Sequence, residues 1–447
     1  MTTPICDFVR RYAEEAPLRL HMPGHKGVSL LGVEALDLTE VSGADVLYDA
    51  NGIIRESMEN AARLFGAKKT LYSTEGSSLS IRAMLYLALL YAKEQGRAAC
   101  RIAAGRNAHR TLISAAALLD LEIDWLWGED LLSCRVTAEE VEAYLDACAE
   151  LPTALYLTSP DYLGNTVDLA SIATVCHARG VLLLVDNAHG AYLKFLPTDR
   201  HPMTLGADAC CDSAHKTLPA LTGCGYLHLS EHAPRVFFEQ AEAAMSLFAS
   251  TSPSYLLLQS LDALNAILDE EFRQALARLC NEVSALRKAL VQHGYSLVGN
   301  EPTKLTIAPK SFGYTGEELA ALLANKGIVC EFADRDFLVM MLSVAHSSDD
   351  LAQLCDALLS IPRRAPIREN PPAPSRAERA TSIREAALSP KEKRPADECL
   401  GRVMASMSVS CPPAVPVAVC GEIIDGQTLT CLKYYGITEC EVCTKKI

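Results

Sequence analysis

Short hydrophobic runs alternate with longer amphipathic runs between about residues 60 and 230. The clearest short runs, TALYLTSP, VLLLVDNAHG and GYLHLS, have the length of buried strands. The clearest long runs, LSIRAMLYLALLYAKEQG and DLASIATVCHARG, repeat their hydrophobic residues with the helical period. Strands that alternate with helices are typical of an α/β protein with a mostly parallel sheet. We therefore predict an α/β fold for this part of the chain.

The pattern changes after about residue 260. Residues 254–293 keep a helical period with charged faces, and the segments KLTIAP, GIVCEFADRDFLVMMLS and SDDLAQLCDALLSI then indicate a small α+β unit. A stretch rich in proline and charge, from PRRAPIRENPP to KRPADE, is expected to be a linker or a segment that wraps the surface. We predict an N-terminal arm, a large domain, a linking helix with a small α+β domain, and a C-terminal domain, over residues 1–55, 56–260, 261–365 and 366–447.

Composition narrows the class of protein. The 447 residues are 49% hydrophobic and 21% charged, as in a globular enzyme. The longest hydrophobic runs, such as MLYLALLYA, are far shorter than the ~20 residues of a membrane span, and the start of the chain lacks a signal-peptide core. The 17 cysteines are therefore expected to be reduced thiols in the cytoplasm. A net charge of -14 argues against a nucleic-acid partner.

Two candidate catalytic charges follow strand-like runs. Asp186 ends VLLLVD, at the sheet edge where open α/β proteins bind ligands, and a carboxylate there can keep a heteroaromatic nitrogen protonated. Its alternative role is that of a loop or N-cap acid. Lys216 in DSAHK could form a Schiff base with an aldehyde, or it could be a solvated surface charge. In an extended segment Ser213 and His215 would point to the same side and could both contact one phosphate.

A phosphate site and a stacking ring complete the set. STEGSSLSIRAM places Gly76, Ser77 and Ser78 at the start of a helix, where free N–H groups and hydroxyls bind phosphate, although ordinary N-capping is the alternative. His109 in GRNAHRTLISAAALL precedes another helix, and its imidazole could lie on a ring or be structural. A phosphate cradle, a stacking ring, a carboxylate and a Schiff-base lysine in one α/β domain indicate pyridoxal 5'-phosphate.

The chain resembles the Orn/Lys/Arg decarboxylase family, which has the aminotransferase-like fold type I. The similarity is carried by LHMPGHKG, LYSTEGSSLSIRAML, RNAHRTLISAA, TSPDYLGNTVDL, LLVDNAHGAYLKF, DSAHKTLPALTG and STSPSYLLLQSLD, and it extends into the tail from SIREAAL to VCGEII. It implies a large domain that binds pyridoxal 5'-phosphate, a decarboxylase-type C-terminal domain, and the compact branch without an N-terminal wing domain. It also implies that a basic L-amino acid, lysine, arginine or ornithine, loses carbon dioxide to give the amine.

The resemblance implies a role for each candidate residue. Lys216 would bind the cofactor aldehyde, Asp186 would pair with the pyridine nitrogen, and Lys216 or His189 would return a proton to Cα. His109 would stack on the ring. The phosphate would be held by Gly76, Ser77, Ser78, Ser213 and His215, with Ser250 or Thr251 reaching in from the second subunit of a homodimer.

The distal cation of the substrate requires an acidic partner, because an unpaired buried charge is costly. Glu331 in GIVCEF matches a family position near the polar groups of the substrate. Asp161 in SPDYLGN is either a specificity element or a turn residue, and Asp334 and Asp45 are further candidates. The choice between lysine, arginine and ornithine stays open, partly because TLPALTG departs from many relatives.

Three alternatives accompany this interpretation. The chain could be an aminotransferase or a lyase of the same fold type, or a relative that binds the cofactor without catalysis. Lys26 in HMPGHKG competes with Lys216 for the catalytic role, but it lies in a probable loop, which we expect to line the site or the dimer interface. Cys440 and Cys443, with Cys420 and Cys431, could bind zinc only if the tail folds back, so no metal is expected.

Overall fold

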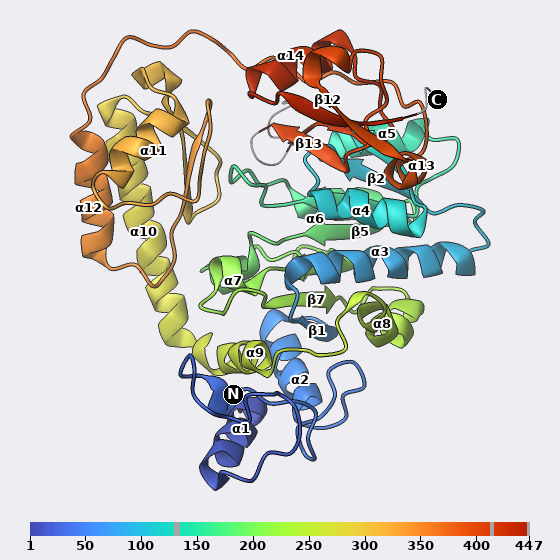
Figure 1. Cartoon of the computed structure of the whole chain (residues 1–447), viewed down its shortest axis with the longest axis vertical. Coiled ribbons are helices and arrows are strands. Elements are labelled where there is room, and N and C mark those ends of the chain that lie inside the picture. The colour runs from blue at the N-terminus through green and yellow to red at the C-terminus, as the bar shows by residue number, and fades with distance from the viewer. Residues whose placement is uncertain (129–134, 412–414, 445–447) are drawn as a thin grey trace. The chain divides into compact units, whose positions relative to one another are not determined.

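The computed structural model of the chain describes residues 1–128, 135–411 and 415–444. They form two compact units whose segments are interleaved in sequence (Figure 1). The first unit comprises Met1–Ala98, Thr153–Leu157 and Leu169–Gln274, and the second comprises Ala99–Pro152, Thr158–Asp168 and Ala275–Ile447. The domain boundaries predicted at residues 55, 260 and 365 stay predictions. Among the described residues, no helix combines the length and the hydrophobicity that a membrane crossing requires.

A seven-stranded sheet has the strand order β1-β7-β6-β5-β4-β2-β3. Strands β5 and β6 are parallel, as are β2 and β3, whereas β7 runs antiparallel to both β1 and β6. The prediction of a mostly parallel α/β sheet is therefore confirmed. Its strands are β1 (Lys69–Ser73), β2 (Arg101–Gly105), β3 (Glu122–Leu126), β4 (Ala154–Thr158), β5 (Leu182–Asp186), β6 (Ala209–Asp212) and β7 (Gly225–Leu229).

Helices of the first unit follow from the amphipathic runs. Helix α3 (Gly76–Glu94) begins directly after β1 and packs along α8 (Arg235–Phe248). The N-terminal helix α1 (Pro4–Glu15) contacts α2 (Ile53–Phe65) and α9 (Tyr255–Ile267), and α6 (Leu169–His177) precedes β5. Strands β5 and β7 are buried along their whole length, in agreement with the mainly hydrophobic sequences LLLVD and GYLHL.

The segment around the candidate lysine differs from the prediction. Ser213 and His215 were expected to lie on one extended segment, but this is wrong: β6 ends at Asp212, and Ala214–Thr217 form the single helical turn α7. The turn is closed by hydrogen bonds from Lys216 N to Ser213 O and from Leu218 N to Ala214 O. The ladder with β5 ends at the pair Asp186–Cys211 and the ladder with β7 at the pair Asp212–Tyr226, so β6 has no strand partner beyond Asp212.

The second unit contains a four-stranded antiparallel sheet of order β10-β11-β9-β8. Its strands are β8 (Ser296–Val298), β9 (Lys304–Ala308), β10 (Phe332–Ala333) and β11 (Leu338–Met341). They accompany the helices α10 (Glu270–His293), α11 (Gly316–Ala324) and α12 (Ser348–Leu359) (Figure 1). Leu305, Ile307 and Leu338 of the sheet share one hydrophobic core with Leu319 of α11 and Leu358 of α12. The predicted small α+β unit is therefore present.

The C-terminal part of this unit is also α+β. The proline-rich stretch predicted as a linker, residues 362–398, has neither helix nor strand over residues 362–378. Beyond them the prediction of a linker is wrong, because α13 (Ile383–Leu388) and β12 (Lys391–Pro395) lie inside the stretch and belong to the folded C-terminal part. Its other elements are β13 (Ser408–Cys411), β14 (Val415–Val419), α14 (Gly426–Tyr434) and β15 (Glu439–Cys443). Helix α13 packs against α4 (Arg110–Leu119), and α5 (Ala138–Ala147) completes the helices of the unit.

A buried ion pair joins β2 to this C-terminal part. Arg106, directly after β2, donates to both carboxylate oxygens of Glu422 at 2.6 and 2.8 Å, and both side chains are almost fully buried. The guanidinium also lies 5.0 Å from the ring centre of Trp125 and 4.6 Å from that of Trp127. A bidentate pair between aromatic faces is a geometry that arginine provides and lysine does not.

We expect Arg106→Ala to lower the free energy of unfolding by about 3–5 kcal/mol, because it leaves the Glu422 carboxylate buried without its partner. Arg101→Ala, at the other end of β2, is the matched control: it removes an exposed pair with Glu122 worth about 0–1 kcal/mol. Chemical denaturation of both variants measures the difference. Equal losses would contradict the structural role of the buried pair.

Candidate active site

The start of α3 meets the end of β6 through two serine side chains. Ser213 Oγ donates to Ser77 Oγ at 2.8 Å, and both residues are buried. The N-cap residue of α3, Glu75, makes no capping hydrogen bond with its side chain. The Glu75 side chain therefore does not cap this helix, and two hydroxyls lie at its start, where donors of this kind bind phosphate.

Glycine permits this approach. Gly76 has φ +65°, and its N–H donates to Gly223 O at 2.7 Å. A Cβ at Gly225 would lie 2.8 Å from the carbonyl carbon of Gly76, closer than non-bonded carbons approach. The start of β7 and the start of α3 are therefore in backbone contact, and a side chain at Gly225 would separate them.

Two further predicted phosphate ligands flank this point. The Nδ1 atom of His215 lies 2.8 Å from Cys224 O, so it donates to that carbonyl and fixes the ring, whose Cε1 lies near Gly76. Ser250 and Thr251 lie in an exposed loop after α8, and Ser250 N donates to the Glu75 carboxylate at 2.6 Å. This loop is thus attached to the start of α3 in its own chain. Ser78, in the first turn of α3, is half-buried.

Asp186 ends β5 as predicted and is buried. Its Oδ2 accepts from Tyr156 Oη at 3.2 Å, and its Oδ1 accepts from Ala188 N at 3.1 Å and from Cys211 Sγ at 3.6 Å. Burial, with the charge of Asp186 beside them, raises the pKa of Tyr156 and of Cys211 well above their usual values, so both keep their protons and donate. Three donors thus orient this carboxylate.

Lys216 lies next to His189. The Nζ atom of Lys216 is 3.2 Å from Nε2 of His189, which is buried in the loop after Asp186. This distance allows a proton to pass between the two side chains. Lys216, His189 and Asp186 therefore belong to one cluster in the first unit.

His109 is the N-cap residue of α4, in the second unit. Its Nδ1 accepts from Thr111 N at 3.3 Å and lies 2.8 Å from Thr111 Oγ1. The structure therefore gives this histidine a capping role, and the predicted stacking role stays a prediction.

The four candidate substrate acids differ in how their carboxylates are engaged. Asp45 accepts from the N–H group of Val46 and from those of Asn51, Gly52 and Ile54 around the start of α2, and these bonds outweigh burial and lower the pKa of Asp45. Asp334 accepts from two N–H groups of its own turn, and burial raises the pKa of Asp334 to about 6. Both have the contacts of structural acids.

Asp161 is likewise held by its own loop. Its two oxygens accept from the backbone N–H and the side-chain amide of Asn165, at 2.8 and 2.9 Å, and the residue is buried. Lys304 Nζ donates to the carbonyl oxygens of Asp161 and Tyr162, which fixes the loop further. Burial raises the pKa of Asp161 to about 6, although the Asn165 hydrogen bonds oppose this shift. These are the contacts of a turn residue, and a substrate role stays a prediction.

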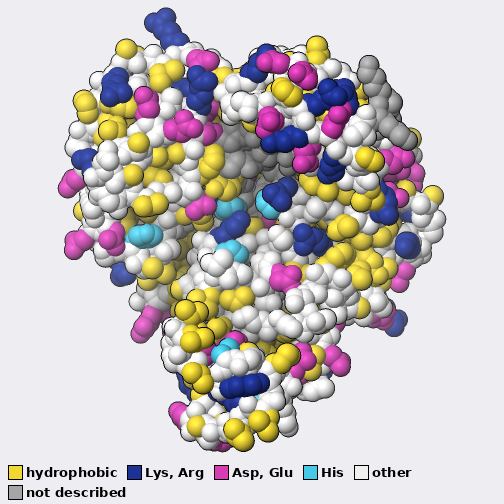
Figure 2. Space-filling view, in the orientation of Figure 1, with side chains coloured by type: hydrophobic (Ala, Val, Ile, Leu, Met, Phe, Trp, Pro, Cys, Tyr) yellow, Lys and Arg dark blue, Asp and Glu magenta, His cyan; other side chains and the backbone are white. Residues whose placement is uncertain are grey.

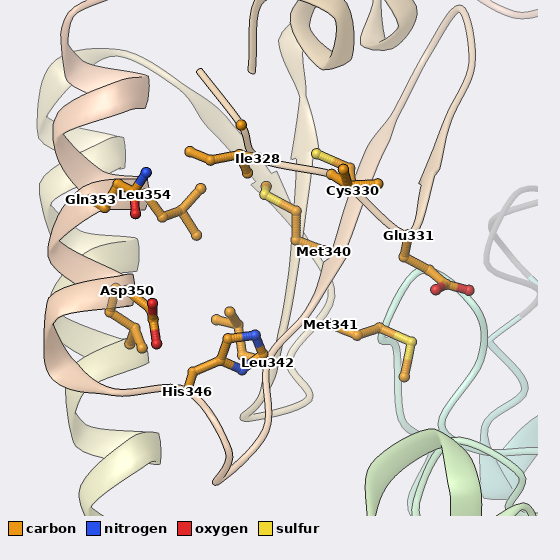
Figure 3. A pocket seen from close by; sticks show the side chains of 13 residues that line it. Ile328, Cys330, Glu331, Met340, Met341, Leu342, His346, Asp350, Gln353 and Leu354 are labelled. Atoms are coloured by element: carbon orange, nitrogen blue, oxygen red, sulfur yellow. The ribbon is translucent and has the colours of Figure 1, made fainter. Parts of the chain in front are cut away.

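Glu331 is exposed and accepts from Tyr162 Oη at 3.0 Å. It lies at one end of a cavity of about 460 Å³ in the second unit, which Met340 and Met341 of β11 line together with Asp350 and Leu354 of α12. Figure 3 shows the Glu331 side chain on the opposite side of this cavity from α12. Of the four acids, Glu331 is the one whose carboxylate receives no backbone hydrogen bond among the described residues.

The cluster in the first unit fits pyridoxal 5'-phosphate. Ser77 and Ser213 at the start of α3 suit the phosphate, Asp186 suits the pyridine nitrogen, and Lys216 suits the aldehyde. One buried polar atom next to Lys216 in the sequence, Thr217 Oγ1, has no hydrogen-bond partner among the described residues. Buried polar atoms are normally satisfied, so this atom agrees with a polar ligand at this edge of the sheet.

The tail cysteines have separate partners. Cys420 Sγ donates to Ile383 O, and Cys431 Sγ lies 3.5 Å from the carbonyl oxygens of Pro372 and Ala373. Cys443 Sγ lies 3.1 Å from Ser389 Oγ. These contacts are those of buried thiols that pack against the backbone.

Sequence reasoning missed the residues that support Asp186. Tyr156 and Cys211 lie on the neighbouring strands β4 and β6, and Asn187 follows Asp186 directly. Tyr156 was part of the strand TALYLTSP, and Cys211 and Asp212 stand next to Ser213, so each was visible. Their roles depend on strand order and register, which hydrophobic periodicity does not reveal.

The family model and the similar proteins that we describe are decarboxylases. A family model described as Orn/Lys/Arg decarboxylase, major domain, matches residues 3–306. An arginine decarboxylase of Halalkalibacterium halodurans is 30% identical over 470 aligned positions, which cover 96% of this chain and 93% of that protein. An arginine decarboxylase of Bacillus subtilis is also 30% identical and covers 96% and 92%. The solved structure of the constitutive lysine decarboxylase of Escherichia coli superimposes with a TM-score of 0.78 at 18% identity, over 99% of this chain and 82% of that one.

The buried acid of the 161–165 loop makes stability depend on pH. The pKa of Asp161 is about 6 in the folded chain against 3.8 for a free side chain, so between these values the folded state binds more protons than the unfolded state. The free energy of unfolding therefore falls as pH rises from 4 to 7, by up to about 3 kcal/mol from this group. We expect Asp161→Asn to remove this contribution.

Denaturation of the wild-type chain and of Asp161→Asn across this pH range measures the effect. The stability advantage of the wild type over the variant should shrink as pH rises. A difference that is the same at pH 4 and pH 7 would contradict the raised pKa.

Proposed function

The chain belongs to the Orn/Lys/Arg decarboxylase family, and from this premise we propose that its substrate is L-arginine, which it converts to the corresponding amine and carbon dioxide. Membership makes the chain a decarboxylase with pyridoxal 5'-phosphate as cofactor. The observation that carries the choice of arginine is the 30% identity, over almost the whole chain, with two proteins named arginine decarboxylase. The lysine decarboxylases of similar fold are 16–18% identical.

Different residues of the first unit would bind different parts of the cofactor. The start of α3 with Ser77 and Ser213 would bind the phosphate, and His215 beside Gly76 would support it. Asp186, oriented by three donors, would hold a proton on the pyridine nitrogen. When bound, the cofactor supplies an electron acceptor for the pair of electrons that the departing carboxylate leaves at Cα.

Lys216 and His189 would transfer the protons of the reaction. Both side chains lie within 3.2 Å of each other, so either can act as general acid toward Cα while the other restores its proton. Orientation of the bond that breaks decides between decarboxylation and other reactions of the same cofactor. The residues that bind the two ends of the substrate would set this orientation.

Glu331 would pair with the distal guanidinium of arginine. Its carboxylate is exposed, whereas Asp45 and Asp161 accept hydrogen bonds at both oxygens and Asp334 accepts two at Oδ1, from N–H groups near them in the sequence. The Tyr162 hydroxyl donates to Oε1 of Glu331 and so limits the freedom of that side chain. A held carboxylate suits a guanidinium, which donates two parallel hydrogen bonds.

A homodimer would cover the N-terminal arm. Six large hydrophobic residues between positions 18 and 31 expose more than half of their surface: Leu18, Leu20, Met22, Val28, Leu30 and Leu31. Figure 2 shows hydrophobic side chains over the lower part of the surface, where Figure 1 places the N-terminus. Exposed hydrophobic surface of this kind marks protein interfaces. Thr251 in its exposed loop would then be available to a second subunit.

The free thiols of the cysteines agree with a cytoplasmic location. Those with described side chains, from Cys6 to Cys443, are free thiols, and most are buried. Free thiols in such number suit a reducing compartment.

The substrate is tested by supplying the purified holoenzyme with arginine, lysine and ornithine separately, while amine and carbon dioxide are measured. We expect arginine to give the highest kcat/KM, because its guanidinium can donate two parallel hydrogen bonds to one carboxylate. Turnover of lysine or ornithine alone would overturn the choice of arginine. Formation of a keto acid in place of carbon dioxide would instead indicate transamination.

The lysine assignment is tested by a pair of variants. Lys216→Ala should abolish both the visible absorbance of the bound cofactor and turnover, because it removes the amine that binds the aldehyde. Lys26→Ala is the matched control: Lys26 also follows a histidine, but its Nζ donates to His21 O in an exposed loop. The control should keep the absorbance, and the reverse result would exchange the two roles.

A further inference from the structure

Asp212, the last residue of β6, accepts hydrogen bonds from three side chains in the core of the first unit. Asn187 Nδ2 donates to Oδ1 at 2.6 Å, and the Nε2 atoms of His201 and His228 lie 3.0 and 3.2 Å from Oδ2. All four residues are fully buried. The function assigned so far uses none of these side chains, although Asp212 directly precedes Ser213 and Asn187 directly follows Asp186.

The ionised carboxylate of Asp212 can only accept, and the contacts of the two rings agree with this direction. Met203 N donates to Nδ1 of His201 at 3.3 Å, so the proton of that ring lies on Nε2 and faces Asp212. The Nδ1 atom of His228 lies 2.8 Å from Thr70 Oγ1, and burial lowers the pKa of His228, which favours the neutral ring. Asp212 is therefore the acceptor in every bond.

The charge of Asp212 is stable in this environment. Burial alone would raise the pKa of Asp212, but its interaction with His201 and the hydrogen bonds from both histidines outweigh it and hold the pKa well below its usual value. A buried carboxylate persists as an anion only with such donors.

A metal site is the competing interpretation, because ligand atoms of His201, Cys210 and Asp212 lie within 4.8 Å of one another. A metal would need the lone pair of His201 Nε2. When Nδ1 accepts from Met203 N, a neutral His201 has its proton on Nε2, and that nitrogen then has no lone pair for a metal. The cluster is thus a hydrogen-bonded one.

Asp212 is connected to both halves of the candidate site. Asn187 is tied to β6 twice, by its side chain to Asp212 and by its N–H to Cys211 O at 3.0 Å. This fixes the segment that carries Asp186 and His189, and Gly190 N donates to Asn187 O at 2.8 Å to close its turn. On the other side, Ser213 O accepts from Lys216 N at 3.0 Å.

We propose that Asp212 is a positioning residue for the cofactor site: its buried carboxylate, held by His201 and His228, fixes the segment after Asp186 and the turn that carries Lys216 in one arrangement. The proposal rests on the assignment of pyridoxal 5'-phosphate to this site. Asp212 itself contacts neither cofactor nor substrate in this role. It acts through Asn187 and through the backbone of Ser213.

The test is Asp212→Asn in the holoenzyme, with Asp208→Asn as the matched control. Asp208 directly precedes β6, is equally buried, and accepts from Leu183 N at 2.7 Å and His177 Nε2 at 3.0 Å. It lies at the opposite end of the same strand, roughly 13 Å away at ~3.3 Å per residue. Both variants lose a buried acceptor, so both should lower the midpoint of thermal unfolding.

The cofactor readouts should separate the two variants. We expect Asp212→Asn to weaken binding of pyridoxal 5'-phosphate by about tenfold to a hundredfold and to change the visible circular dichroism of the bound cofactor, which reports its orientation. We expect kcat to fall by a similar factor while KM for the amino acid changes much less. Asp208→Asn should keep the wild-type circular dichroism and cofactor affinity.

Each outcome decides the proposal. If both variants are destabilised alike and both keep the wild-type cofactor spectrum and affinity, Asp212 is merely structural and the proposal is wrong. If Asp212→Asn does not fold, Asn187→Ala, which leaves Asp212 its two histidines, should show the same spectral change, and an unchanged spectrum overturns the proposal. A wild-type protein that shows no visible band with the cofactor would instead overturn the assignment of the site.

Discussion

The candidate site depends on a contact between two stretches of backbone. The start of β7 and the start of α3 touch at Gly225 and Gly76, where a Cβ would be 2.8 Å from a carbonyl carbon. Because nothing separates these elements, the first turn of α3 reaches the end of β6, and Ser77 meets Ser213. The turn that follows carries Lys216, so the anion-binding end of a helix and a reactive amine are brought to one edge of the sheet.

Three buried charges each have several partners. Asp186 has a hydroxyl, a thiol and a backbone donor, Asp212 has an amide and two imidazoles, and Arg106 has a carboxylate and two indole rings. In a medium of low dielectric such sets hold side chains in one arrangement, because any other leaves a charge without compensation. The two clusters at the end of β6 therefore give rigidity where a cofactor must be oriented.

The local features of the site could be predicted from the sequence. VLLLVD placed Asp186 at the end of a buried strand, and GSSLSIRAM placed Ser77 at a helix start, because periodicity and helix-start signals are local. The turn after Ser213 could not be predicted, since it depends on where β5 stops pairing with β6. The three side-chain partners of Asp212, His201, His228 and Asn187, lie 11, 16 and 25 residues away, and Glu422 lies 316 residues from Arg106. Single-sequence patterns carry no record of such pairings.

The aromatic environment of Arg106 gives the protein a built-in optical reporter. The chain contains 2 tryptophans, Trp125 and Trp127, and both stack on this guanidinium. Intrinsic tryptophan emission of the whole protein therefore originates at a single junction, between the end of β3 and the C-terminal strands. A change in that emission signals separation of the C-terminal part from the sheet, and it distinguishes this event from the melting of segments that contain no indole.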